Sequence, residues 1–285
     1  MCELLAVSTS QPTRLTFSLH RLASHGSTAG LAHDGWGVAF YQGTDVALFR
    51  EPAAAAESAL VRFLEHHGPT TKLTLSHIRH ATWGPVQLSN TQPFVRELGG
   101  RTHAFAHNGY LTNIDKSTVL TLKFDRPIGQ TDSERAFCVL LARMRALHHD
   151  GELPSLKARM TVVEKFAADL RALGAANFLY ADGDALFVHG HRRLTQLGGQ
   201  IEPPSLWMLQ RHSTPHALPP VHEAGVSVLH HSSASVLIAS VPLTHERWKP
   251  LSEGQIVAVQ DGQVIATRLP ASSTQVSSDN ALFQA

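Results

Sequence analysis

The second residue of the chain is a cysteine that directly follows Met1 and opens the apolar run at residues 2–7. Removal of Met1 would leave Cys2 with both a thiol and a free α-amine. The amine has a reference pKa of about 7.7–8.0 and can accept the thiol proton at neutral pH. Position 2 therefore suggests a nucleophile that carries its own base, and the simpler alternative is a small buried apolar residue.

Four further stretches place polar residues and glycines where predicted strands end or a helix begins. They are Asp34-Gly35-Trp36-Gly37, Arg79 with Thr82, His107-Asn108-Gly109 and Thr131-Asp132-Ser133-Glu134. A thiolate that attacks an amide creates an oxyanion, to which the Asn108 side chain and the Gly109 N–H could donate. Arg79 could bind a carboxylate and Asp132 an ammonium. A substrate with a carboxylate, an ammonium and a side-chain amide is glutamine or another γ-glutamyl compound.

Each stretch also has a plainer, structural interpretation. Asn108-Gly109 is a common turn dipeptide, Asp132 could only cap a helix, and Arg79 could be a solvated charge at a strand end. The chemistry is indicated by the combination of these stretches behind Cys2, and not by any one of them.

The elements that would position these residues run from strands to helices and back to strands. Strands are predicted at 38–41, 46–49, 73–78 and 103–106, with a helix at 57–67. Two longer helices begin at Asp132 and near Leu156, and the second is expected to end at Gly174. The first would carry an apolar stripe of Ala136, Phe137, Leu140, Leu141 and Met144. Strands return at 178–180, 186–188, 226–229, 236–241, 256–260 and 264–267. This order predicts two packed antiparallel sheets with helices outside, in one domain at 2–269 followed by a disordered tail at 270–285.

Composition limits the partners and the compartment. The 285 residues are 43% hydrophobic, and Lys+Arg 24 against Asp+Glu 23 gives a net charge of +1 without a basic stripe. This argues against nucleic acid and anionic lipid as partners. No apolar run approaches the ~18 residues of a membrane span, and two cysteines without a signal peptide favour the cytoplasm. The 19 histidines show no metal-ligand spacing, so neither a metal nor another cofactor is expected.

In order and spacing, residues 1–5, 34–37, 107–109 and 131–134 resemble the class II glutamine amidotransferases, and within them the stand-alone YafJ-like branch. Their glutaminase domains are N-terminal nucleophile hydrolases. The resemblance implies an α+β fold, a four-layer αββα sandwich. It also implies that Cys2 forms a γ-glutamyl thioester with its α-amine as proton shuttle.

The remaining site residues follow from the same resemblance. Asn108 and Gly109 would form the oxyanion hole. Arg79, with Thr82 beside it, would bind the substrate α-carboxylate, and Asp132 the α-amino group. His107 and Trp36 would lie close to the substrate, with Trp36 shaping the floor near Cys2.

We therefore expect an enzyme that cleaves the γ-amide of glutamine, or of a γ-glutamyl compound, to glutamate and ammonia or an amine. One alternative is an amidase for a peptide-like or thiol metabolite, of the ergothioneine or glutathione type. Another is a subunit that supplies ammonia to a separate synthase. The non-enzyme alternative is a catalytically idle γ-glutamyl sensor, which is disfavoured because a binder needs no oxyanion hole.

Overall fold

The computed structural model describes residues 2–17, 34–81, 84–148, 152–194, 200–212, 226–228 and 234–270. Thr82 and the predicted tail after Pro270 lie outside the described residues. Within the described part of the chain, no helix is long and apolar enough to cross a membrane.

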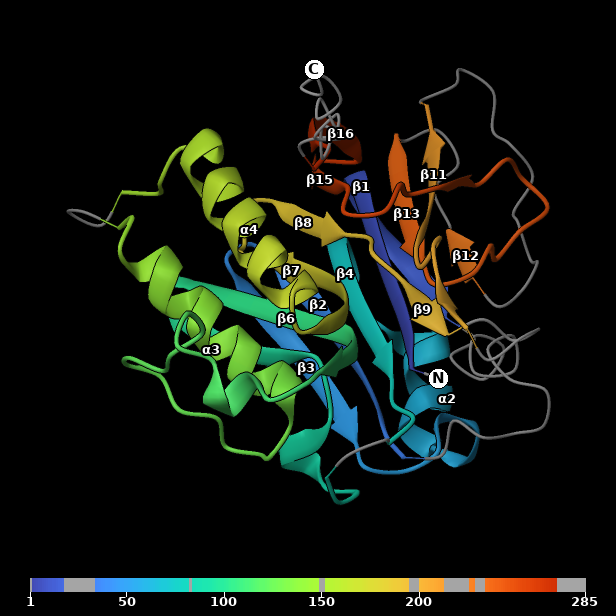
Figure 1. Ribbon diagram of the computed structural model, residues 1–285. Helices are drawn as coiled ribbons and strands as arrows, with labels where there is room; N and C mark the ends of the chain where they lie inside the picture. Colours follow the sequence, from blue (N-terminus) through green and yellow to red (C-terminus); the bar gives the residue numbers. More distant parts are fainter. Residues whose placement is uncertain are drawn as a thin grey trace, which may run out of the picture.

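Two antiparallel sheets lie face to face (Figure 1). The first contains β1 (Glu3–Phe17), β2 (Trp36–Gln42), β3 (Asp45–Glu51), β4 (Thr70–Ile78), β11 (Trp207–Arg211), β12 (Val226–Val228), β13 (Ser235–Ala239) and β14 (Lys249–Pro250). The second contains β5 (Phe94–Leu98), β6 (Arg101–Leu111), β7 (Gly174–Ala181), β8 (Leu186–His189), β15 (Ile256–Gln260) and β16 (Gln263–Arg268). Their orders are β14-β11-β13-β1-β4-β2-β3, with β12 beside β1, and β16-β15-β8-β7-β6-β5. Strands β9 (Arg193–Leu194) and β10 (Ile201–Glu202) form a separate ribbon.

Helices cover the outer faces of both sheets. They are α2 (Ala59–His67), α3 (Asp132–Arg145) and α4 (Leu156–Arg171), and the short 3₁₀ helices are η1 (Ala55–Glu57), η2 (Leu88–Asn90) and η3 (Ile114–Lys116). Side chains alternate between the two faces of each strand. Leu4 and Ala6 therefore pack between the sheets, whereas Leu5 and Val7 pack in the cluster that includes the buried side chains of α2. A third cluster joins the second sheet to α3 and α4. The predicted α+β sandwich of four layers is confirmed.

The long helices follow their predicted patterns with one correction. The apolar stripe predicted on α3 is buried throughout, namely Ala136, Phe137, Leu140, Leu141 and Met144. The expected end of α4 at Gly174 is wrong, because α4 ends at Arg171 and Gly174 begins β7. A Cβ on Gly174 would lie 2.1 Å from the carbonyl oxygen of Tyr110, so close strand packing explains this glycine.

Two other glycines let backbones approach where a side chain would not fit. A Cβ on Gly37 would lie 2.2 Å from the carbonyl oxygen of Gln92, which belongs to the segment before β5. A Cβ on Gly109 would lie 1.8 Å from the carbonyl oxygen of Ala175. The turn interpretation of Asn108-Gly109 is wrong, because β6 continues through both residues to Leu111. Both glycines thus serve close backbone packing beside Gln92 and β7.

We expect Gly37→Ala to lower the free energy of unfolding by about 1–3 kcal/mol, because the new methyl group overlaps the backbone of Gln92. Gly43→Asn is the matched control. It has nothing within 4 Å of its Cβ and a φ of +65° that asparagine tolerates, so a change below about 0.5 kcal/mol is expected. Urea unfolding of both variants measures the difference, and equal stabilities would contradict the packing argument.

Candidate active site

Cys2 lies one residue ahead of β1 and is partly buried. Alternation along the strand places its side chain on the same face as Leu4 and Ala6, between the sheets. Its Sγ accepts a hydrogen bond from the His80 N–H at 3.2 Å and donates one to the His80 carbonyl at 3.3 Å. Burial raises the pKa of the thiol, and the His80 N–H opposes that rise. The backbone of His80, in the loop after β4, therefore orients the sulfur.

Asn108 reaches Cys2 from the opposite sheet. Its position on β6 shares the inward face with Ala104 and Ala106. Its Nδ2 donates to the Cys2 carbonyl at 2.7 Å, and its own carbonyl accepts from Asn177 Nδ2 at 2.9 Å. An amide nitrogen carries two hydrogens, so the second N–H of Asn108 is available for a ligand.

The backbone of β6 supplies a second donor next to Asn108. The N–H of His107 donates to Gln92 Oε1 at 2.6 Å, and the N–H of Leu111 donates to Asp132 Oδ2 at 2.8 Å. Backbone groups alternate in direction along a strand, so the Gly109 N–H points to the same side. Strand β5 does not reach this level, because its pairing with β6 ends at Phe105. The Gly109 N–H thus faces away from β7, on the side where Gln92 and Asp132 accept from the N–H groups of His107 and Leu111.

Asp132 is the first residue of α3 and is partly buried. Its carboxylate accepts from the Leu111 N–H and from the Ser133 N–H at 2.7 Å. The helix is capped by Thr131, whose Oγ1 accepts from the Glu134 N–H at 3.2 Å, so the capping role proposed for Asp132 belongs to its neighbour. Asp132 also lines a cavity of about 410 Å³.

Arg79 follows β4 and is buried to 4% exposure. Its guanidinium donates to the carbonyls of Gly84 and Pro85, each at 3.1 Å, and to that of Asp34 at 3.5 Å. Burial lowers the pKa of Arg79, and Cys2 and Asp34 oppose that shift through their charges. The Asp34 side chain accepts from the Ala81 N–H at 2.7 Å, so Asp34 holds the loop that carries Arg79.

The structure places His107 and Trp36 away from the inward face that carries Cys2. His107 is buried on the helix side of β6, where it stacks on Phe105 and its Nδ1 lies 2.9 Å from Ser133 Oγ. Trp36 is buried in the core cluster that includes α2, and its Nε1 donates to Glu51 at 3.0 Å. His107 thus contacts the start of α3, and Trp36 packs on the α2 side of β2. A contact of either residue with substrate stays a prediction.

Three contributors were not predicted as such. His80 binds the sulfur only through its backbone, Gln92 bonds both backbone groups of His107, and Asp34 was noted as part of a motif without a role. Backbone contacts between distant segments leave no signal in residue type. Asp34 alone could have been assigned, as a carboxylate that holds a turn.

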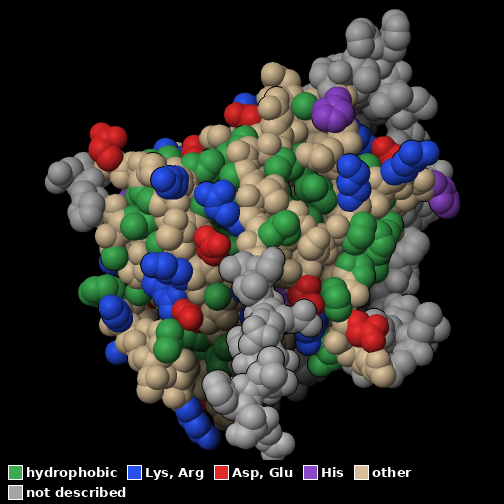
Figure 2. Space-filling view, turned by 45° about the horizontal axis from the view of Figure 1, so that its top comes forward, with side chains coloured by type: hydrophobic (Ala, Val, Ile, Leu, Met, Phe, Trp, Pro, Cys, Tyr) green, Lys and Arg blue, Asp and Glu red, His purple; other side chains and the backbone are tan. Residues whose placement is uncertain are grey.

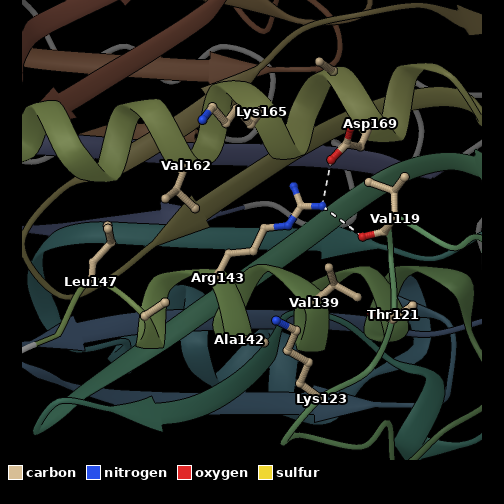
Figure 3. A pocket seen from close by; sticks show the side chains of 12 residues that line it. Val119, Thr121, Lys123, Val139, Ala142, Arg143, Leu147, Val162, Lys165 and Asp169 are labelled. Carbon is tan, nitrogen blue, oxygen red and sulfur yellow. Dashed lines mark hydrogen bonds and ion pairs between the residues drawn. The ribbon is translucent and has the colours of Figure 1, made fainter.

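Elsewhere in the described part of the chain, the cavities and charged groups do not bring the predicted site residues together. A cavity of about 630 Å³ lies between α3 and α4, where Arg143 crosses to Asp169 at 2.7 Å (Figure 3), and it contains none of the predicted site residues. Among the side chains coloured by type on the face in Figure 2, basic and acidic groups are interspersed. No three His, Cys, Asp or Glu residues of the described chain are grouped to hold a metal ion.

Comparison with known proteins gives consistent results. Residues 1–282 match the family model described as "Glutamine amidotransferases class-II". The chain is 32% identical over 265 residues to "Putative glutamine amidotransferase YafJ" of Escherichia coli (strain K12), covering 90% of this chain and 96% of that protein. It is similar to a crystal structure of a "predicted glutamine amidotransferase" from Pseudomonas aeruginosa PA01, with 34% identity, a TM-score of 0.69, and coverage of 93% of this chain and 100% of that one. Glutamine phosphoribosylpyrophosphate amidotransferase of B. subtilis shares the fold at 15% identity and a TM-score of 0.56, with 94% of this chain covering 49% of that one.

The two cysteines are expected to differ in reactivity toward iodoacetamide. Cys138 is 1% exposed and burial raises its pKa to about 11, whereas Cys2 is partly exposed and accepts an N–H. Burial raises the pKa of both thiols, so the difference depends on the access of the reagent to Cys2 and on the N–H that opposes the rise there. Because only the thiolate reacts, we expect the folded chain at pH 8.5 to gain one carboxamidomethyl group, measured by intact mass. Cys2→Ala should gain none and Cys138→Ala one. Fast labelling of Cys138 in the folded protein would contradict this assignment.

Proposed function

The chain belongs to the class II glutamine amidotransferases, and from that premise we propose that it hydrolyses the γ-amide of glutamine, or of a γ-glutamyl amide, through a thioester on Cys2. The supporting observation is the hydrogen bond from Asn108 to the Cys2 carbonyl. This bond places an amide with a spare N–H beside the thiol, next to the Gly109 N–H. We further propose that the enzyme works in the cytoplasm, as its cysteine usage indicates.

The first half-reaction uses groups that Cys2 and β6 supply. After removal of Met1, the Sγ proton passes to the α-amine, and the thiolate attacks the amide carbon to form a C–S bond. The carbonyl electron pair moves onto oxygen, where the N–H groups of Asn108 and Gly109 stabilise the oxyanion. The α-ammonium then protonates the leaving nitrogen, and the C–N bond breaks to release ammonia or an amine.

The second half-reaction returns the enzyme to its starting state. The α-amine takes a proton from water as the water oxygen attacks the thioester carbon. The same donors hold the second oxyanion, the C–S bond breaks, and the Cys2 thiolate regains its proton. The products are glutamate and the free enzyme, so water and substrate supply every other atom and no cofactor enters the sequence.

Arg79 and Asp132 are proposed to bind the two ends of the substrate backbone. The carbonyls of Asp34, Gly84 and Pro85 are neutral, so they orient the Arg79 guanidinium without cancelling its charge for an incoming carboxylate. Asp132 is held by N–H donors at the start of α3, and its remaining lone pairs can accept from an α-ammonium.

One observation favours a second candidate function, the supply of ammonia to a separate synthase subunit. Val86, Leu88 and Ile128 are exposed by 49%, 50% and 74%. Val86 and Leu88 lie on the loop that follows Arg79, and Ile128 lies on the loop that leads into Asp132. A 2.8 Å hydrogen bond from Gln87 to Gln130 joins the two loops. An exposed apolar rim beside a site is typical of a docking surface. In that case the ammonia would pass to the partner's substrate.

Cys2→Ala is expected to abolish glutamate release from glutamine while leaving Tm unchanged, because the variant lacks the nucleophile. The measurement uses protein shown by intact mass to lack Met1, with glutamate release and adduct formation by 6-diazo-5-oxo-L-norleucine as readouts. Wild type and the control Cys138→Ala should each gain one adduct. Near-normal turnover in Cys2→Ala would refute the thioester mechanism.

Asp132→Asn is expected to raise KM for glutamine about 10- to 100-fold with a much smaller change in kcat, because a hydrogen bond between charged groups contributes about 1.5–3 kcal/mol. Asp115→Asn is the matched control, since Asp115 is an exposed carboxylate that lines the same cavity. Steady-state kinetics compare the two, and equal KM values would exclude Asp132 from ammonium binding.

A further inference from the structure

Glu3, the residue directly after the nucleophile, is a buried carboxylate. It is 1% exposed, and alternation places its side chain on the face of β1 opposite to Cys2. Its Oε1 lies 3.1 Å from Nη2 of Arg193, which is itself 8% exposed. Burial raises the pKa of the Glu3 carboxyl, and Arg193 and the Ser240 hydroxyl oppose that rise. A charged pair withdrawn from water is costly, so its place directly behind the nucleophile calls for a function.

Arg193 is fixed by other contacts around the start of β1. Its Nη1 donates to the Ser240 carbonyl at 2.5 Å, and Ser240 Oγ accepts from the Leu4 N–H at 2.9 Å. The residue before it, Arg192, offers its carbonyl to Asn177 Nδ2 at 2.7 Å. The Ser240 carbonyl therefore holds the Arg193 guanidinium against Glu3, and the bond from Asn177 to the Arg192 carbonyl fixes the preceding backbone.

These contacts close a ring around the nucleophile. Asn177 Nδ2 bonds both the Arg192 carbonyl and the Asn108 carbonyl, and Asn108 bonds the Cys2 carbonyl. Arg193 bonds Glu3, which is covalently joined to Cys2. A continuous chain of contacts therefore connects Asn108, the proposed oxyanion donor, to the Glu3–Arg193 pair, and both ends of that chain contact or adjoin Cys2.

The charged groups that surround Cys2 come from several elements. Glu3 disfavours the thiolate through its charge, whereas Arg79, which follows β4, favours it. Asp34, in the segment before β2, acts on Arg79. On the inward face, His77 is fully buried with a pKa lowered to about 3 and is neutral. Removing either member of the Glu3–Arg193 pair would therefore change the net charge behind Cys2 by one unit.

We propose that Glu3, clamped by Arg193, is a positioning residue that keeps the charge directly behind the Cys2 thiol and α-amine balanced. Its purpose rests on the proposed function, because proton exchange between thiol and amine needs both groups to titrate near neutral pH. The pair acts through the amine and the sulfur, and it does not touch the substrate.

The test measures the rate of Cys2 alkylation by iodoacetamide from pH 5 to 10 in Met1-free protein carrying Cys138→Ala. The midpoint is the pH at which the alkylation rate reaches half of its plateau. Glu3→Gln leaves the Arg193 charge uncompensated, which stabilises the thiolate, so this midpoint should fall by about one pH unit. Arg193→Met leaves the carboxylate uncompensated, so the midpoint should rise. The double variant Glu3→Gln/Arg193→Met and the conservative Arg193→Lys should both stay within about 0.3 of the Cys138→Ala parent.

A purely structural clamp would lower Tm in these variants without moving any midpoint, and that result would overturn the proposal. If Glu3→Gln does not fold, Arg193→Met and the double variant still decide it, because only a charge effect moves the first and restores the second. Glutamate release is assayed separately. If the midpoints shift but the protein never releases glutamate, the proposed function is refuted and the charge role of the pair stands. If the protein turns over glutamine but the midpoints do not shift, the charge role is refuted and the proposed function stands.

Discussion

The hydrogen bond from Asn108 Nδ2 to the Cys2 carbonyl is the contact on which the site depends, because it joins the two sheets at the residue that carries the thiol. It forms only if the inward faces of β1 and β6 present residues 2 and 108 together. A shift of one residue in the pairing of β1 with β4 would turn Cys2 outward and bring Glu3 to the inner face. The buried Leu4 and Ala6 resist that shift, so core packing fixes the geometry of the chemistry.

The second donor at the site arises from where a strand stops. Strand β5 pairs with β6 only as far as Phe105, and the side chain of Gln92 takes over at His107 with two bonds to its backbone. Gly37 is needed opposite because no side chain fits against Gln92. At Gly109, two residues further along β6, the structure gives no strand partner on this side among the described residues. The end of the β5–β6 pairing is therefore what would leave a backbone N–H for the proposed oxyanion hole.

Much of the architecture was predictable because it depends on local periodicity. The stripe on α3 and the strands of the β7–β8 hairpin were found from residue spacing. Asn108-Gly109 was open to a turn interpretation because local preference cannot register the pairing with Asn177 and Ala176, which overrides it. His107 lies on the helix side of β6 while Asn108 points toward Cys2, because neighbouring residues on a strand face opposite sides of the sheet. Contacts such as His80 with Cys2 join backbone atoms 78 residues apart and have no sequence signature.

Electrostatics also explain why the base should be the α-amine and not a side chain. His77 pairs with Leu4 across β1 and β4 and lies on the inward face, the natural place for a general base. Burial lowers its pKa to about 3, so it is neutral and a poor proton acceptor at pH 7. An α-amine titrates near the pH at which the enzyme must work and is attached to the nucleophile itself. Burial between the sheets therefore lowers the pKa of His77 too far for it to act as a base at neutral pH. The α-amine of Cys2 is then the group suited to take the thiol proton.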